Sequence, residues 1–332
     1  REQPDCHGYR ILGGGAMARV FTEGFEHGTI GPFSGGSVIT SDPTPRSGQY
    51  AFMAQTGYQW ARIPELDELY LRIGVNPRTY SYRSVFLLSP AHAVIGRIGF
   101  NNGLMDLRVG STVVSTAPCE HFKWFLLEWH LKIADSGGVS EVRVDGEMVM
   151  TFTGDTKPGT EGYVAKLAID NLIAADDIAI NDTSGSENNS WCGDGRIFPL
   201  IPSGDALVQW LPLSGPVNYA MVDEIPPDGD TTFVYTDKAG KVDKYSVTGS
   251  LPTPVRGVRG VIVYAQAKAL TGEALGLRLG VDSNGSESWS GTITLPTSWA
   301  IVNSGLITKD PATGQDWTVE GVQNSRVAIK SV

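Results

Sequence analysis

The chain has 332 residues, and its 40 glycines and 19 prolines interrupt regular structure too often for long helices to dominate. A hydrophobic content of 41% excludes a disordered chain, while a net charge of −10 without clusters of Lys and Arg makes nucleic acid an unexpected partner. No apolar run approaches the roughly 18 residues of a membrane span, so membrane insertion is not expected.

Residues 1–18 are polar and contain a Gly-Gly-Gly run at 13–15, so we expect an N-terminal arm or extension outside the folded core. The run Met-Ala-Arg-Val-Phe at 17–21 is typical of a translation start. Two interpretations remain open. Residues 1–16 are an incidental extension, or they form an arm that docks on a neighbouring subunit.

Residues 19–184 alternate apolar and polar side chains with the period of two that is typical of half-buried strands. A helix over residues 122–133 would instead spread charged side chains around its whole circumference. Asn102-Gly103 and Asp145-Gly146 are typical of two-residue type I′ hairpin turns. Short strands joined by such turns, without intervening helices, predict an antiparallel jelly roll over this span.

The polar stretch at 181–190 contains no apolar side chain and marks a domain boundary, so we assign residues 185–195 to a linker. Residues 196–332 are predicted to form a second β-sandwich. Trp129 and Trp210 lie in alternating strands and are expected to be buried. The predicted fold class is therefore all-β, with two tandem antiparallel jelly-roll-like sandwiches after a short arm. The expected strands of the second domain include 206–210, 232–235, 258–267 and 275–281.

Three cysteines, Cys6, Cys119 and Cys192, are far apart and form no C-x-x-C pair, so the sequence offers no zinc site of four close ligands. Their odd number leaves at least one free thiol or an intermolecular bridge. His7 and His121 lie beside two of these cysteines. Adjacent residues on a strand point to opposite faces, so no catalytic pair is expected from them.

One acidic run invites comparison with glycoside hydrolases of the jelly-roll fold, which carry alternating acids on one strand. Glu65-Leu66-Asp67-Glu68 begins such a pattern, but Leu69 and Tyr70 occupy the positions of the second catalytic glutamate. We therefore predict a turn at 65–68, ahead of the 69–73 strand, and no catalytic residue.

Two acidic groups could supply the oxygen ligands that Ca²⁺ prefers, but neither has the spacing of a known calcium loop. Solvated turns are the expected alternative, so no metal and no cofactor is predicted. Carbohydrate binding would use exposed aromatic side chains, whereas most tryptophans of a β-sandwich pack in its core. The acidic residues are Asp170, Asp176, Asp177, Asp228 and Asp230, and the aromatic candidates are Tyr58, Trp60 and Trp191.

The segment from Trp124 to Asp182 resembles a concanavalin A-like, laminin-G-like jelly roll. The resemblance rests on the strand Phe-Leu-Leu-Glu-Trp, the turn Val-Arg-Val-Asp-Gly and the sequence Ile-Asp-Asn that leads to Asp-Asp-Ile-Ala-Ile. These lie at 125–129, 142–146, 169–171 and 176–180, together with Ile-Ala-Asp-Ser-Gly-Gly at 133–138.

Further segments resemble a family of tailed-bacteriophage structural proteins in which a laminin-G-like domain precedes a C-terminal β region. They lie at 17–21 with 24–26, at 181–196, at 210–237 and at 310–318. This resemblance implies a non-enzymatic virion structural protein on the surface of the phage particle, as a capsid-decoration, minor capsid, tail or fibre component.

The expected partners are other virion proteins and further copies of the chain in a homo-oligomer, with a host-surface glycan as an additional ligand. Rigid sandwiches with exposed loops suit such contacts, and no chemistry is required of them. The alternative is a carbohydrate-binding or glycoside-cleaving jelly-roll protein.

Overall fold

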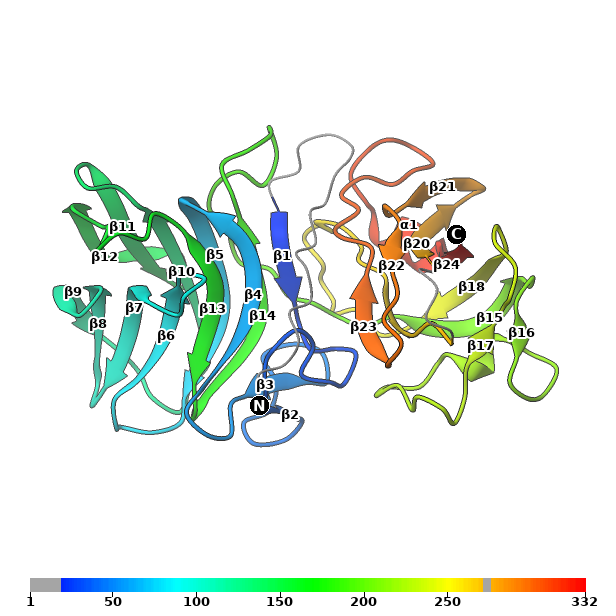
Figure 1. The fold of residues 1–332 in the computed structure, drawn as a ribbon, viewed down its shortest axis with the longest axis horizontal. Coiled ribbons are helices and arrows are strands. Elements are labelled where there is room, and N and C mark those ends of the chain that lie inside the picture. Colours follow the sequence, from blue (N-terminus) through cyan, green and yellow to red (C-terminus); the bar gives the residue numbers. More distant parts are fainter. Residues whose placement is uncertain (1–18, 271–275) are drawn as a thin grey trace.

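The computed structural model describes residues 19–270 and 276–332. They form an all-β protein whose strands gather in two units (Figure 1). The first unit contains β1(Arg19–Glu23), β2(Ser37–Ile39), β3(Ala51–Met53), β4(Tyr58–Leu66), β5(Glu68–Pro77), β6(Arg83–Leu88), β7(Val94–Asn101), β8(Leu104–Val109), β9(Thr112–Pro118), β10(Phe125–Lys132), β11(Gly138–Val144), β12(Glu147–Gly154), β13(Val164–Asp170) and β14(Ile173–Asn181).

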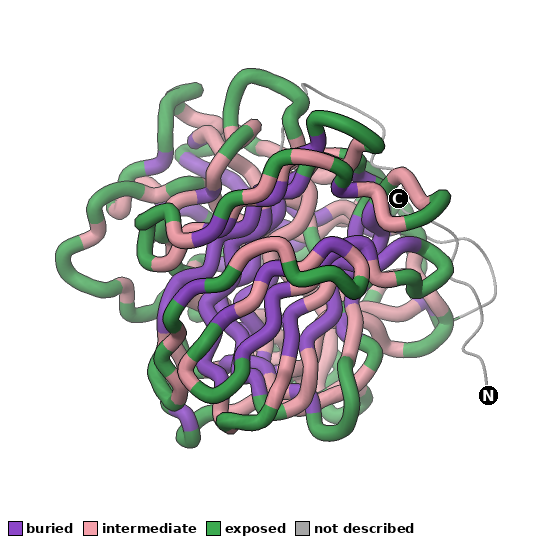
Figure 2. The backbone as a smooth tube through the Cα atoms, turned by 90° about the vertical axis from the view of Figure 1, so that its left-hand side faces the viewer, coloured by how far each residue is buried: buried purple, intermediate pink, exposed green. Residues whose placement is uncertain are grey.

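The first unit is a sandwich of two antiparallel sheets. Sheet A has the order β12-β11-β10-β5-β14-β3-β2, with β1 also paired to β14, and sheet B has the order β4-β13-β6-β7-β8-β9. Alternate residues of each strand face the other sheet, and Trp129 lies among them with 0% of its surface exposed. This confirms the predicted core position of Trp129. The buried stretches run through the sheets, while the connecting loops are exposed (Figure 2).

The two glycine turns predicted from the sequence are confirmed. Asn102 and Gly103 have φ angles of 46° and 84°, and Asp145 and Gly146 have 50° and 90°. Both pairs have positive φ at the two central residues, as a type I′ turn requires. The turn predicted over 65–68 is shorter than expected, because β4 continues to Leu66 and β5 begins at Glu68.

Replacing Gly146 by Val is expected to lower the free energy of unfolding by about 1 kcal/mol or more, because a β-branched residue is strained at positive φ. A Cβ atom at this position would meet no atom within 4 Å, so the cost comes from the backbone alone. Gly162 is equally open but has no positive φ, which makes Gly162→Val the matched control in urea unfolding. Equal losses from the two variants would contradict the turn assignment.

The second unit consists of one six-stranded sheet, two short two-stranded sheets and a core of its own. The six-stranded sheet has the order β15-β18-β24-β20-β21, with β22 paired to β20. The elements are β15(Ile201–Leu207), β16(Leu211–Pro212), η1(Tyr219–Met221), β17(Val234–Tyr235), β18(Val242–Thr248), β19(Tyr264–Ala267), β20(Gly276–Ser283), β21(Ser286–Trp289), β22(Ile293–Thr294), β23(Ala300–Asn303), α1(Val319–Asn324) and β24(Arg326–Ser331). Among the described residues, no helix is long enough and apolar enough to cross a membrane.

Three details of the second unit correct the sequence prediction. The strand expected at 206–210 ends at Leu207, because the backbone N–H groups of Gln209 and Trp210 donate to the carboxylate of Asp243 instead of a strand ladder. Trp210 is half-buried rather than buried, and its indole N–H donates to the carbonyl oxygen of Lys241. The strand expected at 258–267 is reduced to Tyr264–Ala267.

Candidate functional site

A segment between the two units, residues 190–197, lies on the outer face of sheet A, and we call it the crossing segment. Its Gly193 N–H donates to the Glu128 carboxylate on β10 at 2.7 Å. The Cys192 thiol is buried and lies 3.5 Å from the carbonyl oxygen of Tyr70 on β5. The predicted linker 185–195 thus includes residues that are packed against the first unit.

Trp191 adds an aromatic contact to the same face. Its ring lies edge-on to Tyr70, and the guanidinium of Arg143 lies 3.9 Å from the centroid of the Trp191 ring. Tyr70 in turn stacks on His130, with centroids 4.2 Å apart. One face of the Trp191 ring, a candidate for sugar stacking, is therefore covered by the Arg143 guanidinium of its own chain.

The acidic run at 65–68 contributes one residue to this cluster. Glu68 accepts a hydrogen bond from one ring nitrogen of His130 at 2.9 Å, and Glu141 faces the other ring nitrogen at 3.0 Å. A glycosidase needs two carboxylates that face one bond of the substrate. Here an imidazole stands between the two carboxylates and occupies the space where such a bond would lie.

A buried ion pair within the first unit holds the carboxylate to which the end of the crossing segment is bonded. The Arg46 guanidinium lies 2.6 Å from the Asp177 carboxylate, and the exposed fractions of the two side chains are 8% and 0%. Asp177 also accepts hydrogen bonds from the Ser47 hydroxyl at 2.6 Å and from the Ile197 N–H at 2.8 Å. A buried charge with this many partners holds the chain in one position.

A β-bulge in β14 directs the Asp177 side chain to these partners. The register of β14 against β5 shifts between Asp176 and Ala179, and Asp177 has a φ of 51°. Bulges redirect a side chain from its regular alternation along a strand. Arg46 and Asp194 form a second ion pair at 2.7 Å, which ties the loop before β3 to the crossing segment.

The second unit also contacts the chain around β1. The Tyr264 hydroxyl donates to the carbonyl oxygen of Thr22 at 2.9 Å, and the Tyr50 hydroxyl donates to that of Ile225 at 3.4 Å. A Cβ atom on Gly24 would lie 2.6 Å from the Cβ of Ile197, so only glycine permits this approach. The two units therefore share a junction made from several separate segments.

Two further acids are buried at this junction, and both titrate abnormally. Burial raises the pKa of Asp176 well above its usual value, and the neighbouring Asp177 charge raises it further. Burial also raises the pKa of Glu26 to about 7, although the N–H groups of Gln49 and Tyr50 donate to it and oppose the shift. The folded protein thus favours the protonated form of Glu26.

The raised pKa of Glu26 predicts a pH-dependent stability. Its contribution is fully present below the unfolded pKa of about 4.5 and is lost as the pH rises through about 7. Glutamine does not titrate, so Glu26→Gln should not lose this contribution. Between pH 4.5 and pH 8 its free energy of unfolding, relative to that of the wild type, is expected to rise by about 2–3 kcal/mol, as measured by urea unfolding. Glu65→Gln, at an exposed position of β4, is the control and should show no such difference. An identical pH profile for Glu26→Gln and wild type would contradict the shift.

The acidic residues considered as calcium ligands are only partly brought together. Asp176 and Asp177 are adjacent and bonded within the junction, whereas Asp170 ends β13 and accepts the N–H of Asn171. Asp228 bonds Thr232, and Asp230 pairs with Lys268. In residues 19–270 and 276–332, no group of three or more His, Cys, Asp or Glu side chains is arranged to hold a metal ion.

Two of the three cysteines lie in the described part of the chain, and both are free thiols. Burial raises the pKa of Cys119 to about 12 and also raises that of Cys192. His121 lies within hydrogen-bond distance of the Thr79 carbonyl oxygen and accepts the N–H of Gly103. Cys6 and His7 lie outside the described residues, as does the predicted arm.

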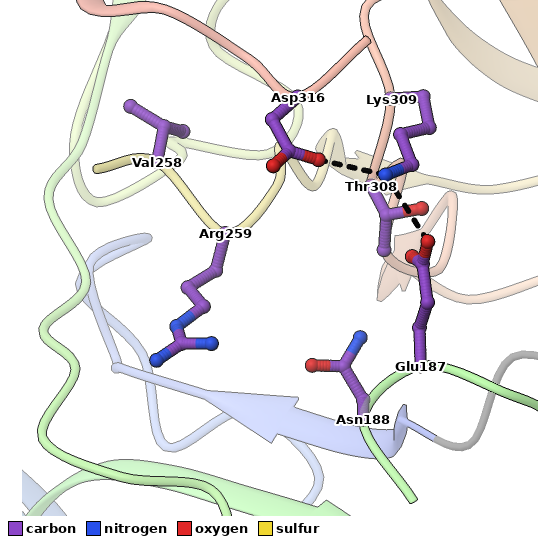
Figure 3. Close-up of a pocket in the computed structure, with 7 residues that line it drawn as sticks. All are labelled: Glu187, Asn188, Val258, Arg259, Thr308, Lys309 and Asp316. Carbon is purple, nitrogen blue, oxygen red and sulfur yellow. Dashed lines mark hydrogen bonds and ion pairs between the residues drawn. The ribbon is translucent and has the colours of Figure 1, made fainter. Parts of the chain in front are cut away.

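A polar cavity of about 240 Å³ lies where the 181–190 stretch meets the second unit (Figure 3). Lys309 pairs there with Asp316 at 2.7 Å and with Glu187 at 3.1 Å, while the Arg259 side chain extends into the cavity from the opposite wall. Three of its seven lining residues, Glu187, Lys309 and Asp316, are charges paired with one another. The cavity therefore lies beside an ion-pair network that links the polar stretch to the second unit.

Neither a protein-family model nor a curated protein matches this sequence. Solved structures share part of its strand arrangement. A sialidase aligns with 50% of this chain and 19% of its own, at 12% identity and a TM-score of 0.38. The endo-β-1,4-glucuronan lyase of the fungus Trichoderma reesei aligns with 50% of this chain and 96% of its own, at 13% identity and a TM-score of 0.37. The carbohydrate-binding module CBM66 of Bacillus subtilis covers 46% of this chain and 96% of its own, at 8% identity and a TM-score of 0.33. No functional conclusion follows from likenesses of this size.

Proposed function

We propose that the chain is a non-enzymatic structural protein of a tailed-bacteriophage virion, displayed on the capsid or tail and acting through contacts with other virion proteins. The proposal joins the sequence resemblance to the junction between the two units. The alternative of a glycoside-cleaving protein has less support, because the His130 ring separates Glu68 from Glu141.

The crossing segment is the observation that carries the proposal. It belongs to the 181–196 stretch that resembles the phage family, and its Trp191 and Cys192 occupy part of the outer face of sheet A. The buried Arg46–Asp177 pair then fixes the segment at its far end. The chain uses its own residues to hold its two β units in one arrangement. Such an arrangement suits a structural protein that attaches to a particle through one unit and displays the other.

An apolar surface on the second unit supports a protein contact. Leu211 on β16 is directly opposite Tyr235 on β17, and their side chains are 56% and 39% exposed. Leu213, two residues after Leu211, is 44% exposed. Exposed apolar side chains gathered on one small sheet are typical of interaction sites. We propose this two-stranded sheet as the surface that attaches the chain to the particle.

Virions purified by density gradient and washed in high salt test the proposal. The chain is expected to remain with the particles at a fixed ratio to the major capsid protein. Leu211→Asp should release it, whereas Leu104→Asp, at an exposed leucine of the first unit, should not. Loss of the wild-type chain during washing would contradict a virion role. Retention of both variants would place the attachment elsewhere and contradict the assignment to the β16–β17 sheet.

A further inference from the structure

The outer face of sheet B carries a row of side chains that crosses five strands. The strand register places Trp60 of β4 beside Ala168 of β13, and Ala168 beside Phe86 of β6. Phe86 is opposite Arg97 of β7, which is opposite Arg108 of β8. Neighbouring strands lie about 4.8 Å apart, so the row is about 19 Å long. We call it the cross-sheet row.

Aromatic side chains make up one half of this surface. Tyr58 is 44% exposed and packs against Phe86 with centroids 5.6 Å apart. Trp60 is half-buried, with the Lys166 ammonium 4.9 Å from the centroid of its ring. Flat apolar rings held in place by their neighbours offer stacking area at a low cost in conformational entropy.

Basic side chains accompany the aromatic ones along the row. Arg97 and Arg108 both lie over the ring of Tyr82, at 5.5 and 5.3 Å. At the other end, Arg62 is opposite Lys166 in the register, and the positive charge of Arg62 contributes with burial to a lowered pKa of Lys166. Local positive charge on a chain with a net charge of −10 favours an anionic ligand at this surface.

Carboxylates on the same face restrict which anion fits. Asp106 pairs with Arg108 at 2.9 Å and accepts the Tyr82 hydroxyl, and Asp170 is opposite Tyr58 in the register. A carboxylate repels the continuous line of phosphates in a nucleic acid, but it accepts hydrogen bonds from hydroxyl groups. A sugar ring offers hydroxyl donors as well as a weakly polar face that stacks on an aromatic ring.

We infer that the cross-sheet row binds an acidic polysaccharide, with carboxylate-bearing sugar rings stacked on Trp60 and Phe86 and a sugar carboxylate paired with Arg97, while Asp106, held by Arg108, accepts hydrogen bonds from sugar hydroxyl groups. The assignment goes beyond the proposed attachment to a virion, because it concerns the first unit, whereas the proposed attachment surface is the β16–β17 sheet of the second unit. On a particle, it would give the displayed chain a polysaccharide-binding face.

Isothermal titration of the purified full chain with polygalacturonate and with hyaluronan tests the inference. Three comparison ligands test the specificity. Neutral dextran shows whether a neutral glycan binds, oligo(dT) shows whether a nucleic acid binds, and poly-glutamate shows whether negative charge without a sugar is sufficient. Trp60→Ala and Arg97→Gln are each expected to weaken binding at least tenfold. Arg97→Gln provides a second test in case Trp60→Ala fails to fold, as judged by its thermal midpoint.

Matched controls lie in the second unit. Trp299 is half-buried with the Lys268 ammonium 4.5 Å from its ring centroid, so Trp299→Ala removes the same kind of pair from another surface. Arg256→Gln removes one exposed positive charge. Neither should change binding. Three results would each overturn the inference. The wild type binds neither polysaccharide, it binds oligo(dT) or poly-glutamate equally well, or Trp60→Ala and Arg97→Gln have no effect. None of these results bears on retention in virions, so the two proposals fail separately.

Discussion

Asp177→Asn is expected to lower the free energy of unfolding by about 3–5 kcal/mol, because it leaves the buried Arg46 guanidinium with the exposed Asp194 carboxylate in place of its fully buried charged partner. Asparagine tolerates the positive φ of this position better than most residues, so the change isolates the loss of charge from backbone strain. Calorimetry should also show the two units melting in separate transitions, since the Ile197 N–H loses a charged acceptor.

Two comparisons make this prediction specific. Arg78→Met removes an ion pair with Asp42, whose side chain is 82% exposed, and should change stability little. Combining Asp177→Asn with Arg46→Met removes both buried charges and should cost less than the sum of the single changes. A loss of only about 1 kcal/mol from Asp177→Asn, the size typical of a surface pair, would show that the junction does not depend on this contact.

The second large effect is expected in the core of the first unit. Trp129→Ala should cost about 3–5 kcal/mol, because it leaves a cavity between the sheets. The Trp129 side chain is fully buried, and its indole N–H donates to the Ser140 hydroxyl at 2.9 Å. A Cβ atom on Gly96 of sheet B would lie only 2.8 Å from the indole ring, so glycine there makes room for it.

The free energy of unfolding from urea titration measures this loss. Val113→Ala, at a side chain that is 44% exposed on β9, is the control and should stay close to the wild type. An unchanged urea midpoint for Trp129→Ala would place β10 outside the core. A loss well above that expected for the cavity would indicate that Ser140, left without its donor, adds a polar penalty.

The parts of the fold that were predictable depend on residues close in sequence. Asp145-Gly146 specifies its turn because two adjacent residues set the required φ angles, and the alternation at 127–133 reflects the two faces of a single strand. The end of the strand expected at 206–210 escaped prediction because a distant carboxylate, Asp243, captures backbone donors that alternation would assign to a ladder.

The junction depends on contacts that no local pattern indicates. Arg46 and Asp177 are 131 residues apart, and Glu26 and Gln49 are 23 residues apart. Asp177 was considered as a calcium ligand, since residue type alone does not distinguish a ligand from an ion-pair partner. The aromatic and basic halves of the cross-sheet row are likewise assembled from five strands, and their order follows from the register rather than from the sequence.

The crossing segment has a mechanical consequence. The first unit begins and ends at one corner, where Arg19 is paired with Asn181, so tension between these two points would open the β1–β14 ladder one pair at a time. Tension that arrives from the second unit meets residues 191–197 first, and these are bonded to β14, β5 and β10. The force is thereby distributed over three strands in the middle of sheet A. The Arg19–Asn181 end of the β1–β14 ladder is protected from sequential opening.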